Sequence, residues 1–104
     1  MALLLACIFL GMSYGSHAAD KPTIHTVVID AMQFSPQSVE VNVGDTVIWK
    51  NQDPFPHTAT SDNRSFNSGD IATNRSWKFQ ARKKGTFPYS CALHPTMKGT
   101  LIVK

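Results

Sequence analysis

Residues 38–51 read SVEVNVGDTVIWKN, and this stretch decides the fold class. Its apolar residues alternate with polar ones on both sides of a central Gly-Asp pair: Val39, Val41, Val43, Val47 and Trp49. A period of two places alternate side chains on the same face of a β-strand, and Gly-Asp supplies turn chemistry. The stretch therefore predicts a β-hairpin with one buried face.

The rest of the chain shows similar short strand patterns. Further strands are expected at 23–29, 76–80, 86–91 and 100–104, with clusters of Asn, Asp, Gly, Ser and Pro between them. No window keeps an apolar stripe of helical period for three turns. Short strands at regular spacing predict an all-β protein, with an antiparallel Greek-key β-sandwich as its one domain.

The N-terminal segment differs in composition from the rest of the chain. Residues 2–12 form an uninterrupted apolar run, and Ser-His-Ala at 16–18 then gives a small-x-small cleavage pattern. We predict a signal peptide at 1–18, a folded domain at 19–104 and a periplasmic location. Since a spanning helix needs about 20 apolar residues, stable membrane insertion through an uncleaved anchor is the less favoured alternative.

Charge sets limits on the partners of the domain. Ten Lys and Arg residues against seven Asp and Glu residues give a net charge of +3. This mildly basic balance, without a stripe of basic residues, does not indicate a nucleic-acid partner. We expect the domain to be a monomer.

Cysteine usage points toward the chemistry of the protein. Removal of the predicted leader takes away Cys7 and leaves Cys91 as the only thiol, so no disulfide can form within the chain. A single exported cysteine is usually buried, paired with another chain or bound to metal. Phe87, Tyr89 and Cys91 share one face of the expected strand at 86–91, so core-facing aromatics would direct the thiol inward as well.

Residue types that bind metals gather around this thiol. The sequence CALHPTM holds Cys91, His94 and Met97 at intervals of three. A second imidazole would have to come from another loop, and His57 follows the strand that contains the Trp-Lys-Asn sequence. The remaining histidines fit poorly, because one leaves with the leader and the other, His25, has no motif around it.

The donor set selects the metal. Thiolate and thioether sulfurs are soft ligands that suit copper, whereas zinc sites rarely use methionine. His57, Cys91 and His94 would form a roughly trigonal set of strong ligands, with Met97 as a weak axial fourth. Such a site has no free coordination position for a substrate, which favours electron transfer over catalysis at the metal. We therefore predict that the protein is not an enzyme.

These motifs together resemble a known family. The chain from FSPQSVEVNVGDTVIWKN through PHT and FNSG to GTFPYSCALHPTMKGTLIV is similar to small type 1 blue copper proteins of the plastocyanin and amicyanin kind, the cupredoxins. The resemblance implies one copper ion per chain, held by His57, Cys91, His94 and Met97. The two residues between His94 and Met97 match the short ligand loop of amicyanins.

The resemblance also implies contacts around the sulfur and at the surface. The backbone N–H of Thr58 is expected to donate to the Cys91 sulfur. Leu93 stands where these relatives usually have proline, so its N–H is expected as a second donor, which would raise the reduction potential above that of a Leu93→Pro variant. An apolar patch is expected around the exposed edge of His94: Met32, Phe55, Pro56, Leu93 and Pro95.

The function predicted from these observations is an exported carrier of single electrons through a Cu(I)/Cu(II) site. Compatible partners are a cytochrome c, an amine dehydrogenase, or a copper reductase or oxidase, and Lys98 is a candidate for steering an acidic partner. The alternative function is a periplasmic copper chaperone or copper-handling protein. Such a protein usually exposes additional ligands, and after the leader only His25 and Met32 are left unassigned.

Overall fold

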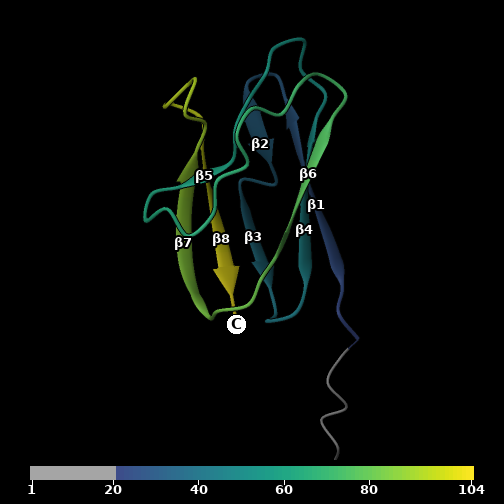
Figure 1. Ribbon diagram of the computed structural model, residues 1–104, viewed down its shortest axis with the longest axis vertical. Helices are drawn as coiled ribbons and strands as arrows, with labels where there is room; N and C mark the ends of the chain where they lie inside the picture. Colours follow the sequence, from purple (N-terminus) through teal and green to yellow (C-terminus); the bar gives the residue numbers. More distant parts are fainter. Residues whose placement is uncertain (1–20) are drawn as a thin grey trace, which may run out of the picture.

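Residues 21–104 are the part of the chain that the computed structural model describes, and they fold into a β-sandwich (Figure 1). The strands are β1 (Ile24–Asp30), β2 (Gln33–Ser35), β3 (Ser38–Val41), β4 (Thr46–Asn51), β5 (Thr60–Ser61), β6 (Ser76–Gln80), β7 (Gly85–Ser90) and β8 (Lys98–Val103). Within these residues, no helix is long and apolar enough to cross a bilayer. The predicted signal peptide at 1–18 lies outside the described residues and stays a prediction.

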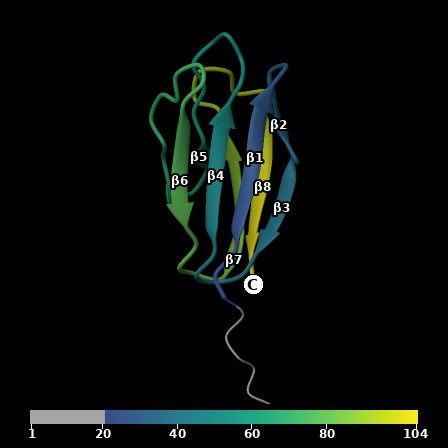
Figure 2. The same ribbon diagram turned by 90° about the vertical axis from the view of Figure 1, so that its right-hand side faces the viewer.

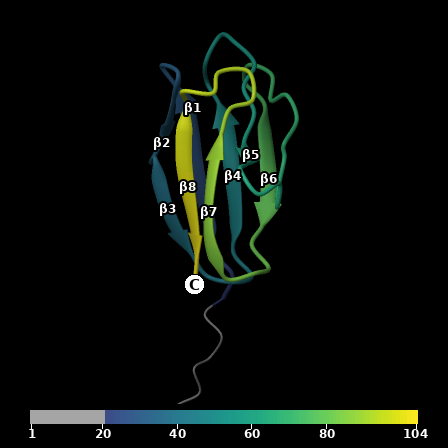
Figure 3. The same cartoon turned by 90° about the vertical axis from the view of Figure 1, so that its left-hand side faces the viewer.

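Two sheets form the sandwich, and Figures 2 and 3 show the two layers. One has the strand order β2-β1-β4-β6, and the other has the order β3-β8-β7-β5. The all-β sandwich predicted from the sequence is confirmed. However, β1 with β4 and β3 with β8 are parallel pairs, because the chain changes sheets both before and after β3. Both sheets are therefore mixed rather than antiparallel throughout.

The hairpin predicted from SVEVNVGDTVIWKN is wrong, although most of its buried residues are right. β3 pairs with β8 in one sheet, while β4 pairs with β1 and β6 in the other. Gly44, with a φ of 97°, lies in the turn that carries the chain between the sheets. Since the two sheets share one core, the alternation buries Val39 and Trp49 from opposite layers, whereas Val43 at the turn is 46% exposed.

The sequence pattern does not predict β2 and β5, which have three and two residues. β2 follows β1 through a two-residue turn in which Ala31 and Met32 have φ values of 50° and 60°. Such turns normally use Asn, Asp or Gly at these positions, so the residue types here give no turn signal. The left-handed backbone of the turn is instead supported by a carboxylate from another loop, described below.

Large aromatic side chains join the two sheets in the core. Trp49 of β4 and Tyr89 of β7 are fully buried, and their ring centroids lie 5.4 Å apart in a T-shaped arrangement. Gly99 on β8 leaves room for the Tyr89 ring, because a Cβ at that position would overlap the ring. Phe87, Tyr89 and Cys91 are all buried, which confirms the predicted inward direction of the thiol just beyond β7.

A buried carboxylate fixes the pole at which β1 and β4 begin. Asp45 accepts hydrogen bonds from the N–H groups of Thr23 and Asn42 at 2.8 and 2.9 Å, and from His25 Nε2 at 2.9 Å. These bonds, led by the one from Thr23, lower the pKa of Asp45 from its ordinary 3.8 to about 2. His25 is therefore engaged at this pole, away from the predicted ligand residues.

Asp45→Asn is expected to destabilise the protein in a manner that depends on pH. A carboxyl with a lowered pKa in the folded state stabilises the fold above its ordinary pKa and loses this effect as pH falls through the folded-state value. The free energy of unfolding of the variant should lie below that of the unsubstituted protein by a constant amount above about pH 4. This difference should shrink between about pH 4 and about pH 2. Urea unfolding across this range measures the difference, with exposed Asp62→Asn as the control for net charge. A difference that stays constant down to the lowest pH would contradict this account.

Candidate metal centre

Two loops from opposite sheets meet at the pole away from Asp45, at the upper end of Figure 1. β7 ends at Ser90 and β8 begins directly opposite, so the loop 91–97 closes this end of one sheet. The loop 52–59 leaves β4 in the other sheet and returns to Thr60, which pairs with Ser90. The two loops therefore lie side by side, and they contain all four predicted ligand residues.

The loop 91–97 is held in shape by its own backbone. The Cys91 N–H donates to the Met97 carbonyl at 3.1 Å, and the Met97 N–H donates to the His94 carbonyl at 2.9 Å. A third bond runs from the His94 N–H to the Cys91 carbonyl at 3.2 Å. Each bond joins two of the three predicted ligand residues that lie in this loop. The spacing of three in the sequence therefore becomes a compact ring of turns.

Thr58 connects the two loops at the sulfur. Its backbone N–H donates to Cys91 Sγ at 3.3 Å, which confirms the donor expected from the family resemblance. Its side-chain Oγ1 accepts a hydrogen bond from the Ala92 N–H at 2.8 Å. Both Thr58 and Cys91 are buried, so the bond to the sulfur forms away from water, and the two bonds together fix the sulfur against the opposite loop.

The expected second donor to the sulfur is wrong. Among the described residues, the Thr58 N–H is the backbone group that bonds Cys91 Sγ, and the Leu93 N–H makes no such bond. The loop turns instead through the bond from the His94 N–H to the Cys91 carbonyl, and the Leu93 side chain is 46% exposed. The higher potential predicted relative to Leu93→Pro therefore loses its physical basis.

His57 is fixed by contacts on both its backbone and its ring. Its N–H and carbonyl form a bridge with Ile71, at 3.2 and 2.7 Å, and its side chain is completely buried. Ring atom Nε2 lies 2.8 Å from Asp53 Oδ2, while Nδ1 lies 3.7 Å from Cys91 Sγ. When the Nε2–H group donates a hydrogen bond to the carboxylate, the ring is neutral and Nδ1 carries a free lone pair. This lone pair faces the sulfur, as a metal ligand requires.

Asp53 is a supporting residue that sequence reasoning missed. Burial acts to raise the pKa of its carboxyl, but hydrogen bonds from the Met32 N–H, His57 and the Ala31 N–H lower the pKa below its ordinary value. The two backbone bonds are 2.9 and 2.8 Å long and support the left-handed turn before β2. The carboxylate therefore stays ionised and serves as the acceptor for His57 Nε2. Its position four residues before His57 was the signal available in the sequence.

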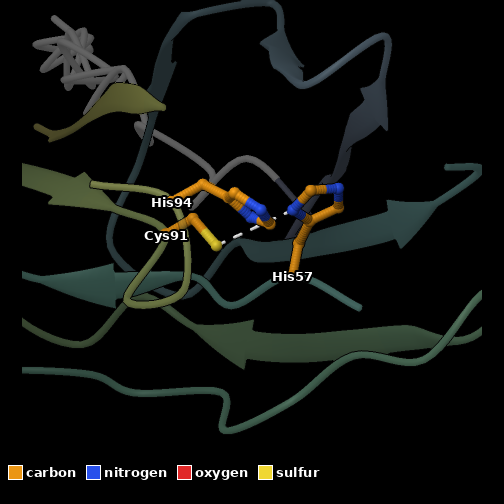
Figure 4. A group of neighbouring side chains, drawn as sticks. All are labelled: His57, Cys91 and His94. Carbon is orange, nitrogen blue, oxygen red and sulfur yellow. Dashed lines mark hydrogen bonds between the residues drawn. The ribbon is translucent and has the colours of Figure 1, made fainter. Parts of the chain in front are cut away.

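The arrangement of the side chains fits a copper ion. One ligand atom each from His57, Cys91 and His94 lies within 4.8 Å of the others, and Figure 4 shows the three side chains converging. His94 Nδ1 is buried and has no hydrogen-bond partner among the described residues, although an unpaired buried nitrogen is costly. Two imidazole nitrogens and one thiolate favour copper, and a bound ion would satisfy the unpaired nitrogen.

The fourth predicted ligand residue lies in the same place. Met97 is 4% exposed and is tied through its backbone to Cys91 and His94. The structure therefore brings His57, Cys91 and His94 into one group, with Met97 in the same loop. His25 stays apart, bonded to Asp45 at the other pole.

Comparisons with known proteins agree with this geometry. Residues 1–103 match the model of the cupredoxin-like domain, and the chain therefore belongs to this family. It is 25% identical to amicyanin of Paracoccus denitrificans, over 97% of this chain and 92% of that protein. It is 32% identical to plastocyanin of Scenedesmus fuscus, over 71% of this chain and 89% of that protein. A purple cupredoxin from Nitrosopumilus maritimus matches with a TM-score of 0.71 and 29% identity, over 77% of this chain and 99% of that one.

Fold, site and family together define the class of protein. The predicted resemblance to small blue copper proteins is confirmed, and copper is the cofactor, with one ion per chain. The chain is an electron carrier of the cupredoxin class rather than an enzyme.

Asp53→Asn tests the support of the site. The amide has one acceptor oxygen where the carboxylate has two, so it cannot accept from all three of His57, Ala31 and Met32, and at least one donor loses its partner. We expect a loss of about 1–3 kcal/mol in the free energy of unfolding. Copper affinity should fall by about 10- to 100-fold. Urea unfolding of the copper-free protein and competition with a copper chelator measure the two effects. Asp62→Asn makes the same charge change on the surface, and an equal effect in this control would refute the role of Asp53.

Proposed function

We propose that His57, Cys91, His94 and Met97 hold the copper ion, and that the protein carries single electrons between larger redox proteins of the periplasm. The observation that supports this proposal is the convergence of two imidazoles and a thiol at one pole of the sandwich, with their ligand atoms within 4.8 Å. The predicted leader at 1–18 supports the proposed location, with the mature domain beginning at residue 19.

For electron transfer, the residues of the chain hold the site rigid, exclude water from it and provide a route to the surface. When bound, copper supplies the one-electron couple between Cu(I) and Cu(II). Cys91 and His57 are fully buried and held by Thr58 and Asp53, so the ligand set is fixed before an electron arrives. A pre-organised, water-free site needs little rearrangement when its charge changes. His94 is only half-buried, and its ring is therefore the proposed exit for the electron.

One expression experiment tests the location and the ligands together. The full chain is produced in a Gram-negative bacterium supplied with copper, and the periplasmic fraction is analysed by intact mass and by visible and electron spin resonance spectra. We expect a mass that begins at Ala19 and an intense visible band from thiolate bound to Cu(II). Cys91→Ser should abolish this band, whereas His25→Gln, which removes a histidine at the other pole, should keep it. A band that survives in Cys91→Ser would rule out the proposed ligand set.

The surface around His94 supports a docking function for redox partners. Three loops contribute apolar side chains to this pole: Met32 is 37% exposed, Phe55 56% and Leu93 46%. Pro56 and Pro95 are also exposed. Small exposed apolar patches suit transient encounters between redox proteins. The proposed partners are a cytochrome c, an amine dehydrogenase, or a copper reductase or oxidase.

If the apolar side chains around His94 form the docking surface, the position of an exposed apolar residue should affect the rate of electron transfer more than its hydrophobicity does. Leu93 and Val43 are each 46% exposed, but they lie at opposite poles of the sandwich. Leu93→Ser should slow electron transfer from the reduced protein to a cytochrome c by about five- to tenfold, because one apolar anchor is lost. Val43→Ser should leave the rate unchanged. Stopped-flow kinetics with excess cytochrome c measures both variants, and equal effects would reject the patch as the docking surface.

The structure offers less support for copper handling as the main role. A handling protein would need ligands that are free to pass the ion onward. His25 is bonded to Asp45 through Nε2, and Met32 is the one sulfur residue outside the proposed ligand set in the part of the chain described. Electron transfer is therefore the better supported function.

A further inference from the structure

A cavity lies between the two sheets at the pole away from the metal centre. It has a volume of about 510 Å³, which falls within the ordinary range for small-molecule sites. Its lining comes from β6, from the loop that joins β6 to β7, and from the lower parts of β7 and β8, with Ser65 added from the loop between β5 and β6. None of the four proposed ligand residues of the copper ion contributes to it.

Strand pairing explains why the sandwich is open at this point. β5 has two residues and pairs only with Tyr89 and Ser90, and the Asp62 N–H then donates to the Pro88 carbonyl at 2.9 Å. Residues 85–87 of β7 therefore have no strand partner on that side among the described residues. β6 is the edge strand of the other sheet. The two edges therefore leave the lower half of the core uncovered by any further strand among the described residues.

The floor of the cavity is apolar. Phe87 and Val103 are core residues, 8% and 4% exposed, and both line the cavity. Phe79 of β6 also lines it and is only partly buried, although it packs against the core. An aromatic ring that stays partly open to water is stabilised when an apolar group covers it.

Cationic residues surround this floor. Lys78, Arg82 and Lys83 line the cavity and are exposed. None of them forms an ion pair with a carboxylate of residues 21–104, since the ion pairs found there involve other residues. Arg82 Nη2 donates to Gln80 Oε1 at 3.4 Å, a neutral acceptor that leaves the charge uncompensated. The positive charge of the rim is therefore available to an anion.

We propose that this cavity binds a single-chain amphipathic anion, with an alkyl chain on Phe79 and Phe87 and a carboxylate head beside Lys83 and Arg82. Charge complementarity selects an anionic head, and the apolar floor between the sheets selects one narrow chain. A bilayer surface would instead meet all the exposed cations of this pole alike, including Lys84, which does not line the cavity. That difference separates a groove ligand from an anionic membrane.

Amide NMR of the Cu(I)-loaded protein, titrated with sodium decanoate below its micelle concentration, tests the proposal. We expect saturable shifts at Phe79, Ala81 and Phe87, without comparable shifts at 91–97. Hexanoate should bind more than about tenfold more weakly, because four methylene groups are missing. Acetate, which has the head without the chain, should produce no saturable shift.

Two charge-reversal variants provide the matched control. Lys83→Glu should weaken decanoate binding by about three- to fivefold, whereas Lys84→Glu, with the same change in net charge, should stay within about twofold. Vesicles of phosphatidylglycerol form the comparison arm. The proposal would be overturned if the two variants weakened decanoate binding equally, or if the shifts centred on the loops around His94. It would also be overturned if the protein bound the vesicles more tightly than decanoate and both variants weakened that vesicle binding to the same extent.

Discussion

The hydrogen bond from the Thr58 N–H to Cys91 Sγ is the contact on which the site depends. It joins the loop after β4, in one sheet, to the loop between β7 and β8, in the other. Cys91 and Thr58 are both buried, so water cannot replace the sulfur as the acceptor for this N–H. The metal centre is thus built across the top of the sandwich, and the packing of the two sheets sets the distance between its ligands.

Asp53 performs the corresponding task for the imidazole. One carboxylate holds His57 Nε2 and also both N–H groups of the turn at Ala31 and Met32. The His57 ring, the turn and the exposed Met32 side chain are therefore placed by a single buried charge. Its negative charge also lies next to a histidine that would bind a cation, which stabilises the loaded site electrostatically.

Some of these features could be read from the sequence, and others could not. Side-chain alternation correctly placed Tyr89 and Cys91 inside, because a period of two does not depend on which strands pair. For the same reason it could not distinguish a hairpin from two strands in opposite sheets, and the pairing of β3 with β8 was missed. Three of the four proposed ligand residues were visible as residue types at close spacing, whereas His57 was assigned from its place after the strand that contains Trp49.

The supporting contacts of the site depend on three-dimensional placement. Asp53 was missed because a carboxylate four residues from a histidine is common in loops, and only the fold brings the turn at Ala31 to the same oxygen atoms. The Leu93 N–H was expected at the sulfur because Leu93 stands where the related proteins usually have proline, but the direction of an N–H is set by the turn. Local patterns therefore predicted which residues take part, and tertiary contacts determined how they are oriented.

The two poles of the sandwich differ in chemistry. One carries the metal centre with apolar side chains around the half-buried His94, and the other carries exposed cations around a cavity with an apolar floor. The cavity ends at Phe87, four residues before Cys91, and about 13 Å of β7 separates the two at strand spacing. Tyr89 stands between Phe87 and Cys91 on the inward face of this strand and packs against Trp49 in the core.

Crystal structures of the copper-free and copper-loaded protein would show whether the fold assembles the site before the ion binds. We expect one copper peak in the anomalous map, between the side chains of His57, Cys91 and His94. We also expect the Thr58 and Asp53 hydrogen bonds to be present in both structures. Copper bound elsewhere, or a His57 ring turned away from Asp53 until the ion arrives, would contradict these expectations.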